Sequence, residues 1–277
     1  MMNKTGENDG EIMSTSTEAR VSISCPDNMI MVPSGSFIRG TAVFPDEGPV
    51  STVYMDSFAM DIFPVTNDQF ALFIDSGGYD NSTLWSGHGW EYIRRNAIRF
   101  PNYWHDPRWN QGDHPVTGIC WWEAMAYASF AGKMLPTEAQ WEYACRGTDG
   151  RTYPWGNDEP TLVHANYAPG CDPAELKRSS TAIDAYPRNK SYFGCSDMAG
   201  NLAEWCLDNA SPDYSYDLTH HNPVYITRED DYHIARGGCG LHNETYLRCS
   251  SRDNYPATVR DNLIGFRCVV NDLAKWK

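Results

Sequence analysis

A thiol and an imidazole lie three residues apart directly after a pair of glycines, in the stretch RGGCGLHNETYLRC at residues 236–249. Cysteine and histidine bind copper, iron and zinc, so Cys239 and His242 can share one metal ion. Two donors do not complete a metal site, and a third ligand is expected on the segment that leads into this loop. The histidines on that segment are His220, His221 and His233.

Two other interpretations of the pair are open. Without a metal, a cysteine beside a histidine can bind substrate or act as a nucleophile, because the imidazole lowers the pKa of the thiol. Alternatively, Cys239 is a small core residue and His242 is a solvent-facing side chain with no chemical role. Other parts of the sequence are needed to choose among the metal site, the metal-free pair and the structural interpretation.

Short strands and capped helices are predicted to position this loop. MIMVPSGSF at residues 29–37 predicts a strand, a turn and the start of a second strand, whereas residues 84–113 form an irregular, tryptophan-rich segment. Three helices are predicted. The first is capped by Thr66 or Asn67 and ends at Gly77-Gly78, and the second runs from about Trp121 to Ala131. The third begins with a capping box of Thr137 and Gln140.

After Arg146 the helical pattern gives way to short segments interrupted by glycine, proline, asparagine and aspartate. No internal repeat or low-complexity linker divides the chain. We therefore predict one α+β domain over residues 25–277, with two or three helices and many short strands. A flexible, polar tail is expected at residues 1–24.

The net negative charge of the chain argues against some classes of binding partner. The chain has 36 acidic and 22 basic residues and a net charge of −14, which argues against binding nucleic acid or an anionic membrane. Its surplus carboxylates suit a hard cation such as calcium. The polar N-terminus and the lack of an apolar run of about 18 residues predict no signal peptide and no membrane span, hence a cytoplasmic protein unless an export signal has been removed.

Several blocks, in order, resemble one family over about residues 29–270. They are MVPSGSF, FPVTNDQF, HPVTGICWWEAMAYASFAGKMLPTEAQWEYACRG, YPWGN, DMAGNLAEW and RGG…LRCSSR…NLIGFRC. The chain is similar to formylglycine-generating enzymes and their relatives, which implies a single α+β domain akin to C-type lectins with little regular secondary structure. GWEY and PNYW resemble the C-terminal domain of ergothioneine-type sulfoxide synthases, although the iron-binding HxxxHxE motif of that branch is missing here.

The Gly-Gly loop departs from the family. Formylglycine-generating enzymes bind copper through two cysteines five apart after a GGS turn, and this loop is three residues shorter. Cys239 matches the serine, His242 matches the first copper cysteine, and the second copper cysteine has no counterpart. The formylglycine reaction itself is therefore not expected by the known mechanism.

The resemblance also assigns a substrate cleft. Arg252 and Arg260 match positions near the cleft of the sulfoxide-synthase branch, where they would clamp a carboxylate against aromatic walls such as Trp104 and Trp121. Tyr255 replaces a carboxylate that this branch keeps, so the substrate is expected to differ. Arg267, in GFRC, is expected to be structural and to pair with buried carboxylates or carbonyls.

DMAGNLAEW resembles the calcium loop of the family. Oxygen ligands on a tight glycine turn suit this ion, and the calcium is expected to be structural. The resemblance assigns the side chains of Asp197 and Glu204 with the carbonyls of Gly200 and Leu202 to a first site, and Asn166, the Tyr167 carbonyl and more loosely Glu175 to a second.

The nine cysteines include no CxxC pair. By resemblance, Cys145 and Cys249 match a disulfide of exported family members and should lie close together. Cys268 matches another bonded position, but its usual partner position is Ala128 here.

The expected function is a metal-dependent, oxygen-using oxidase with copper or iron at Cys239 and His242, His233 being a further candidate ligand. Its substrate would be a small amino-acid-like or peptide molecule held by Arg252 and Arg260. The alternatives are a non-catalytic, lectin-like binding protein and an authentic protein-modifying factor with a divergent site. The sequence does not predict an oligomeric state.

Overall fold

The structure is a computed structural model that describes residues 28–170 and 180–271; the predicted tail at residues 1–24 lies outside them. Its helices are α1 (Asn67–Asp75), α2 (Gly87–Arg95), α3 (Trp121–Phe130) and α4 (Glu138–Arg146), with short 3-10 helices η1 (Pro45–Glu47), η2 (Ser82–Leu84) and η4 (Glu244–Leu247). Its strands are β1 (Met29–Val32), β2 (Gly35–Arg39), β3 (Ser51–Met55), β4 (Phe58–Asp61), β5 (Ala203–Asn209), β6 (Tyr232–Arg236), β7 (Arg252–Pro256), β8 (Ile264–Gly265) and β9 (Val269–Val270). The predicted α+β class is confirmed.

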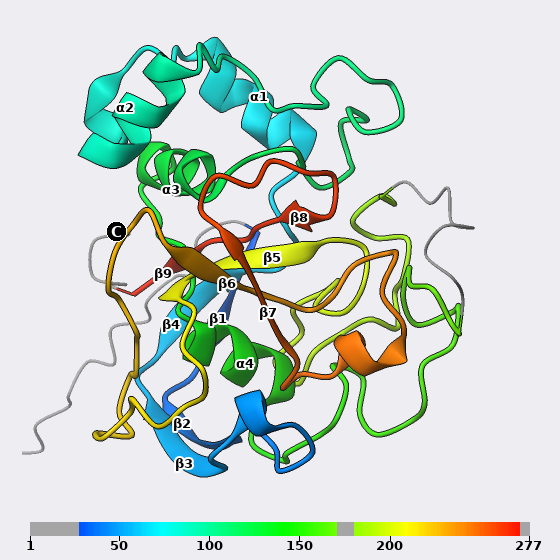
Figure 1. Cartoon of the computed structure of the whole chain (residues 1–277). Coiled ribbons are helices and arrows are strands. Elements are labelled where there is room, and N and C mark those ends of the chain that lie inside the picture. Colours follow the sequence, from blue (N-terminus) through cyan, green and yellow to red (C-terminus); the bar gives the residue numbers. More distant parts are fainter. Residues whose placement is uncertain (1–27, 171–179, 272–277) are drawn as a thin grey trace, which may run out of the picture.

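A four-stranded sheet with the order β7-β6-β5-β8 crosses the middle of the molecule (Figure 1). Helices α1, α2 and α3 lie above this sheet in the view, and α4 lies below it with the β2–β3 pair. The third sheet has the order β1-β4-β9. Strands β6 and β7 are antiparallel, with Arg236 opposite Arg252, so the Gly-Gly loop begins where β6 ends.

The capping residues begin the helices as predicted. The Thr66 side chain accepts the N–H of Gln69 and the Gln69 side chain accepts the N–H of Thr66, which completes a capping box before α1. Thr137 and Gln140 make the same pair of bonds before α4. Each box satisfies two backbone donors that the first turn of a helix leaves unpaired.

The prediction of an irregular segment at residues 84–113 is wrong in part, because helix α2 lies within it. The described residues therefore contain four α-helices, and not two or three. Ser86 caps it by accepting the N–H of Gly89. A Cβ at Gly89 would lie 2.9 Å from the Cβ of Trp122, so a glycine lets α2 pack directly on α3. The sequence pattern missed this helix because glycine is a poor helix former and only tertiary packing makes it favourable here.

Two apolar clusters hold these layers together. One, above the sheet, includes Phe70, Trp205 and Phe266, and the other, below it, includes Trp141 and Met198, all at most 1% exposed. Side chains of β5 enter both clusters, so this central strand is buried on both faces. Within residues 28–170 and 180–271, no helix has the length and apolar character needed to span a membrane.

Candidate functional site

The turn after β6 needs its two glycines. Gly237 and Gly238 have φ values of 92° and 67°, a backbone region that other residues adopt at a cost. A Cβ at Gly238 would lie 2.9 Å from the carbonyl oxygen of Tyr246, and one at Gly237 would lie 3.2 Å from that of Met198. The turn therefore directs the next residue, Cys239, into the interior.

Cys239 is fully buried. Burial raises the pKa of its thiol to about 11, while backbone N–H groups of Leu241 and His242 act in the opposite direction. The thiol is therefore neutral near pH 7 in the metal-free protein. A raised pKa argues against a thiol activated by the His242 ring, because such activation requires a lowered pKa.

His242 turns its ring onto Tyr246, with the ring centroids 4.2 Å apart. Its Nδ1 is buried and has no hydrogen-bond partner among the described residues. Burial lowers the pKa of the imidazole, so the ring is neutral near pH 7. A neutral, unpartnered nitrogen is available as a metal ligand or as an acceptor for a substrate N–H. His242 is half-buried, with this nitrogen turned away from solvent.

The other histidines are placed apart from this loop. His233 stacks on Trp121 at 3.8 Å, and its Nε2 lies 3.2 Å from the Glu229 carbonyl oxygen. His220 lies 3.7 Å from Asp217, and His221 lies 3.2 Å from Asp56. Across the described ranges, no three histidine, cysteine or acidic side chains converge on a possible metal position. The structure therefore places the candidate third ligands away from Cys239 and His242.

The predicted substrate-binding arginines contact protein carboxylates. Arg252 donates to both oxygens of Glu138 at 2.7 and 2.9 Å, and Arg260 donates to both oxygens of Glu123 at 2.7 and 3.1 Å. The two guanidinium side chains are only 3% and 11% exposed. The proposed aromatic wall Trp121 is also buried, with its Nε1 donating to the Cys206 carbonyl. These contacts give both arginines structural roles.

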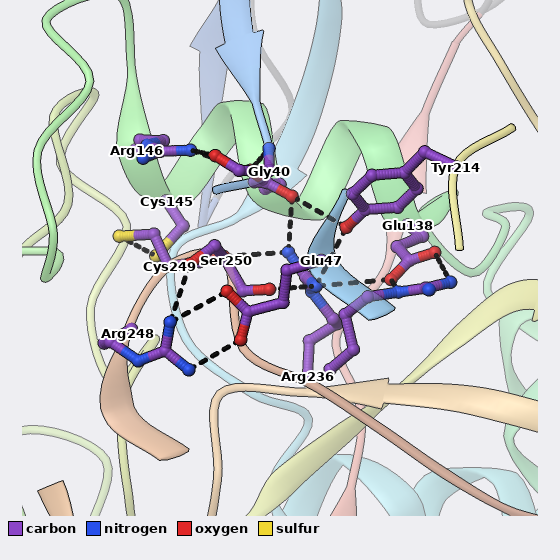
Figure 2. A network of polar contacts seen from close by, with 12 residues as sticks. Gly40, Glu47, Glu138, Cys145, Arg146, Tyr214, Arg236, Arg248, Cys249 and Ser250 are labelled. Atoms are coloured by element: carbon purple, nitrogen blue, oxygen red, sulfur yellow. Dashed lines mark hydrogen bonds and ion pairs between the residues drawn. The ribbon is translucent and has the colours of Figure 1, made fainter. Parts of the chain in front are cut away.

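Arg252 adjoins a buried polar network beneath the sheet. Arg236 donates to Glu138 at 3.2 Å and to Glu142 at 2.7 Å, and Figure 2 shows Arg236 beside Glu138. Arg236 also donates to the Cys249 carbonyl at 2.8 Å. In the same view the sulfurs of Cys145 and Cys249 lie side by side, 3.1 Å apart. The predicted proximity of these two cysteines is confirmed.

Residues 15–272 match the sulfatase-modifying factor enzyme 1-like domain family. The chain belongs to this family. Among curated proteins it is 32% identical to the formylglycine-generating enzyme of Bos taurus, over 90% of this chain and 76% of that protein. It is 32% identical to hercynine oxygenase of Mycolicibacterium smegmatis, over 81% of this chain and 56% of that protein. These relatives, both named as enzymes, confirm the resemblance and the single family domain.

The chain also matches part of a longer protein and one solved structure. It is 35% identical to serine/threonine-protein kinase pkn1 of Chlamydia caviae, over 87% of this chain but only 37% of that protein. The structure of PvdO from Pseudomonas aeruginosa superposes with a TM-score of 0.67 at 21% identity, over 88% of this chain and 94% of the other. The second likeness shows that PvdO shares the fold.

The loop that matches the family's calcium site supports the Gly-Gly turn. The N–H of Gly200 donates to the Gly237 carbonyl at 2.8 Å, so the two loops are directly bonded. Asp197 is buried, with Oδ2 lacking a hydrogen-bond partner among the described residues, and burial raises the pKa of its carboxyl to about 8. A buried carboxylate oxygen without a donor is what a bound cation would satisfy. Asp197 therefore fits a calcium ligand.

Glu204 fits that role less well. Its oxygens accept from Arg267 at 2.7 and 2.8 Å, and Oε2 also accepts from Trp141 Nε1 at 2.8 Å. A guanidinium in this position repels a second cation, so Glu204 is a weaker candidate calcium ligand than Asp197. The predicted structural role of Arg267 is confirmed.

The second calcium assignment is incomplete in the structure. The Asn166 carbonyl accepts the N–H of Asn201 at 2.8 Å. Tyr167 follows it and is buried. The looser candidate Glu175 lies outside the described residues.

Two carboxylates near the Cys239 thiol were not predicted. Asp253 and Asp261 both raise the pKa of Cys239, and Asp253 accepts the hydroxyl of Tyr255 at 2.6 Å. Both lie in RDNYPATVRD, each next to one of the two arginines that the resemblance assigns to the cleft. Strand β7 presents Asp253 and Tyr255 on one face, since they are two residues apart.

Proposed function

We propose that this chain is an oxidase-type enzyme that acts on a small amino-acid-like or peptide substrate at the Gly237-Gly238 loop. The observation that carries the proposal is the pair of buried donors on this loop, the Cys239 thiol and the unpartnered Nδ1 of His242. The relatives named formylglycine-generating enzyme and hercynine oxygenase support an enzyme of this type.

Cys239 and His242 would hold copper or iron, which supplies one-electron and oxygen chemistry when bound. The fit is partial, because a cation would satisfy the unpartnered imidazole nitrogen, but no third protein ligand converges among the described residues. Further positions would have to be filled by substrate or water. The buried, neutral thiol would lose its proton on binding, since metals bind the thiolate.

A non-catalytic binding protein is the second candidate. It is favoured by the commitment of Arg252 and Arg260 to buried glutamates, which leaves neither guanidinium free to clamp a reacting carboxylate. In that case Cys239 is a core residue that replaces serine, and the loop only contacts a ligand.

Metal content distinguishes the two candidates. We expect protein purified without added metal to contain close to one copper or iron per chain, measured by elemental analysis. Cys239→Ser and His242→Ala should each remove most of that metal, and the double variant should lose little more, because the two donors share one ion. His88→Ala is the matched control, since its side chain is 65% exposed, and it should keep the metal.

Two results would reject this site. One is calcium alone in the purified protein, which favours the binding protein. The other is full retention of copper or iron by Cys239→Ser. Rapid alkylation of Cys239 at pH 7 in metal-free protein would instead revive the activated thiol, which the raised pKa of this group argues against.

We also propose a structural calcium ion at Asp197, supported by the unpartnered Oδ2 of this residue. The carbonyls of Gly200 and Leu202 are its other candidate ligands.

A further inference from the structure

A cavity lies apart from the Gly-Gly loop, between the first turn of α4, the turn that joins β3 to β4, and residues 222–226. Its volume is about 340 Å³, within the range of pockets that bind small molecules. The described lining contains no residue of the loop that carries Cys239 and His242. The cavity therefore shares no described lining residue with the proposed oxidase site.

Apolar side chains from distant parts of the chain form most of its wall. Met55 ends β3, Leu207 comes from β5, and Met134 follows α3. Met134, Val224 and Ile226 are 44%, 41% and 62% exposed although they converge on one cavity. Apolar surface in water is unfavourable by about 25 cal/mol per Å², so a ligand with an alkyl chain would gain by covering it.

The charge of the cavity comes from one residue. Asp56 is the charged residue of the described lining, and its side chain is 64% exposed. His221 Nε2 at 3.2 Å and Asn222 Nδ2 at 2.6 Å hold the carboxylate and lower its pKa, so it is ionised near pH 7. The Asp56 carboxylate is therefore held in place at the rim of the cavity and remains accessible to a ligand.

The neutral polar groups of the lining are largely satisfied within the protein. Gln140 donates to the Asn271 side chain at 2.6 Å, and its carbonyl oxygen accepts the N–H of Thr137 at 3.0 Å. These groups therefore offer few hydrogen bonds to a ligand, and recognition has to come from the apolar wall and from the single carboxylate.

We propose that this cavity binds an aliphatic ammonium group, with the alkyl chain against Met134, Leu207 and Val224 and the ammonium facing Asp56. Such a group can come from a free alkylamine or from a lysine side chain of a peptide. Both present a cation on four or more methylenes, which matches an apolar cavity with one acidic rim.

Calorimetric titration with n-hexylamine, n-hexanol and hexanoate at pH 7 tests the proposal. Hexylamine should bind severalfold more tightly than hexanoate, because Asp56 attracts the ammonium and repels the carboxylate. Asp56→Asn should weaken hexylamine about two- to fivefold, as expected for one exposed ion pair, and leave hexanol unchanged. Equal affinity of hexylamine and hexanoate would overturn the proposal.

A cavity-filling pair of variants locates the binding. Val224→Trp should weaken hexylamine at least tenfold, because the indole takes the space of the alkyl chain. Val163→Trp is the matched control at a 56% exposed valine outside the cavity, and it should bind as the unchanged protein does. Unchanged affinity in Val224→Trp would overturn the proposal, and Asp56→Asn serves as the test if Val224→Trp does not fold.

A third arm distinguishes the two sources. Nα-acetyl-lysine methylamide binding within threefold of hexylamine would assign the cavity to a lysine side chain of a peptide. Binding at least tenfold weaker than hexylamine would assign it to a free amine.

Discussion

Arg267→Met is expected to lower the free energy of unfolding by about 3–5 kcal/mol, the usual result of leaving a buried charge without its partner. Arg267 is fully buried and holds both oxygens of Glu204, which is itself only 1% exposed. Its guanidinium also donates to the carbonyls of Asp61, Ile62 and Ser196. The substitution would leave those carbonyls and one carboxylate without their principal donor. Equilibrium denaturation in urea, followed by tryptophan fluorescence, measures the change.

A second substitution isolates the charge. Glu204→Gln in the Arg267→Met background removes the buried negative charge, and it should recover part of the loss. Arg95→Met is the control, because Arg95 and Glu91 form an exposed pair with side chains 73% and 64% exposed, and it should change stability by less than about 0.5 kcal/mol. If Arg267→Met and Arg95→Met had equal effects, the buried pair would not stabilise the fold.

Features set by neighbouring residues could be predicted from the sequence. The capping boxes at Thr66 and Thr137 involve groups three residues apart, and each determines where a helix begins. Helix α2 could not be predicted in this way, because its glycine at position 89 is favourable only once Trp122 is packed against it. The local sequence of this segment favours an irregular structure, whereas its packing on Trp122 favours a helix.

In the candidate site, too, some features could be predicted from the sequence and others could not. Resemblance placed Cys145 beside Cys249 and gave Arg267 a structural role, and both predictions are confirmed. The carboxylates that hold Arg252 and Arg260 lie 114 and 137 residues away in the sequence, and no local pattern points to such partners. A matched position therefore did not predict what each guanidinium binds.

The loop before Glu204, which carries Asp197, gives the second large effect. In metal-free protein, we expect stability to fall as the pH rises from about 4 to about 8. The carboxyl of Asp197 has a pKa of about 8 in the folded state, raised mainly by burial, and about 3.9 when unfolded. Between these values the folded state keeps a proton that the unfolded state releases, so rising pH favours unfolding. Each unit of difference corresponds to about 1.4 kcal/mol, so the total is several kcal/mol.

Calcium should reverse this trend if it binds the ionised Asp197. Added calcium should raise the melting temperature little at pH 5, where a proton competes for the carboxylate, and strongly at pH 8.5. Asp197→Asn carries no titrating proton, so it should both reduce the fall in stability with pH and remove most of the calcium effect. Differential scanning calorimetry with calcium and with chelator at the two pH values measures both.

The control for this test is Asp75→Asn, at an exposed aspartate that ends α1, and it should keep both the pH dependence and the calcium effect. An unchanged calcium response in Asp197→Asn would place the ion elsewhere. A calcium response in neither protein would reject the structural ion.

Because the N–H of Gly200 donates to the Gly237 carbonyl, an ion at Asp197 would also hold the turn that buries Cys239. Asp197→Asn is therefore expected to lower the copper or iron content of the protein, whereas Asp75→Asn should not.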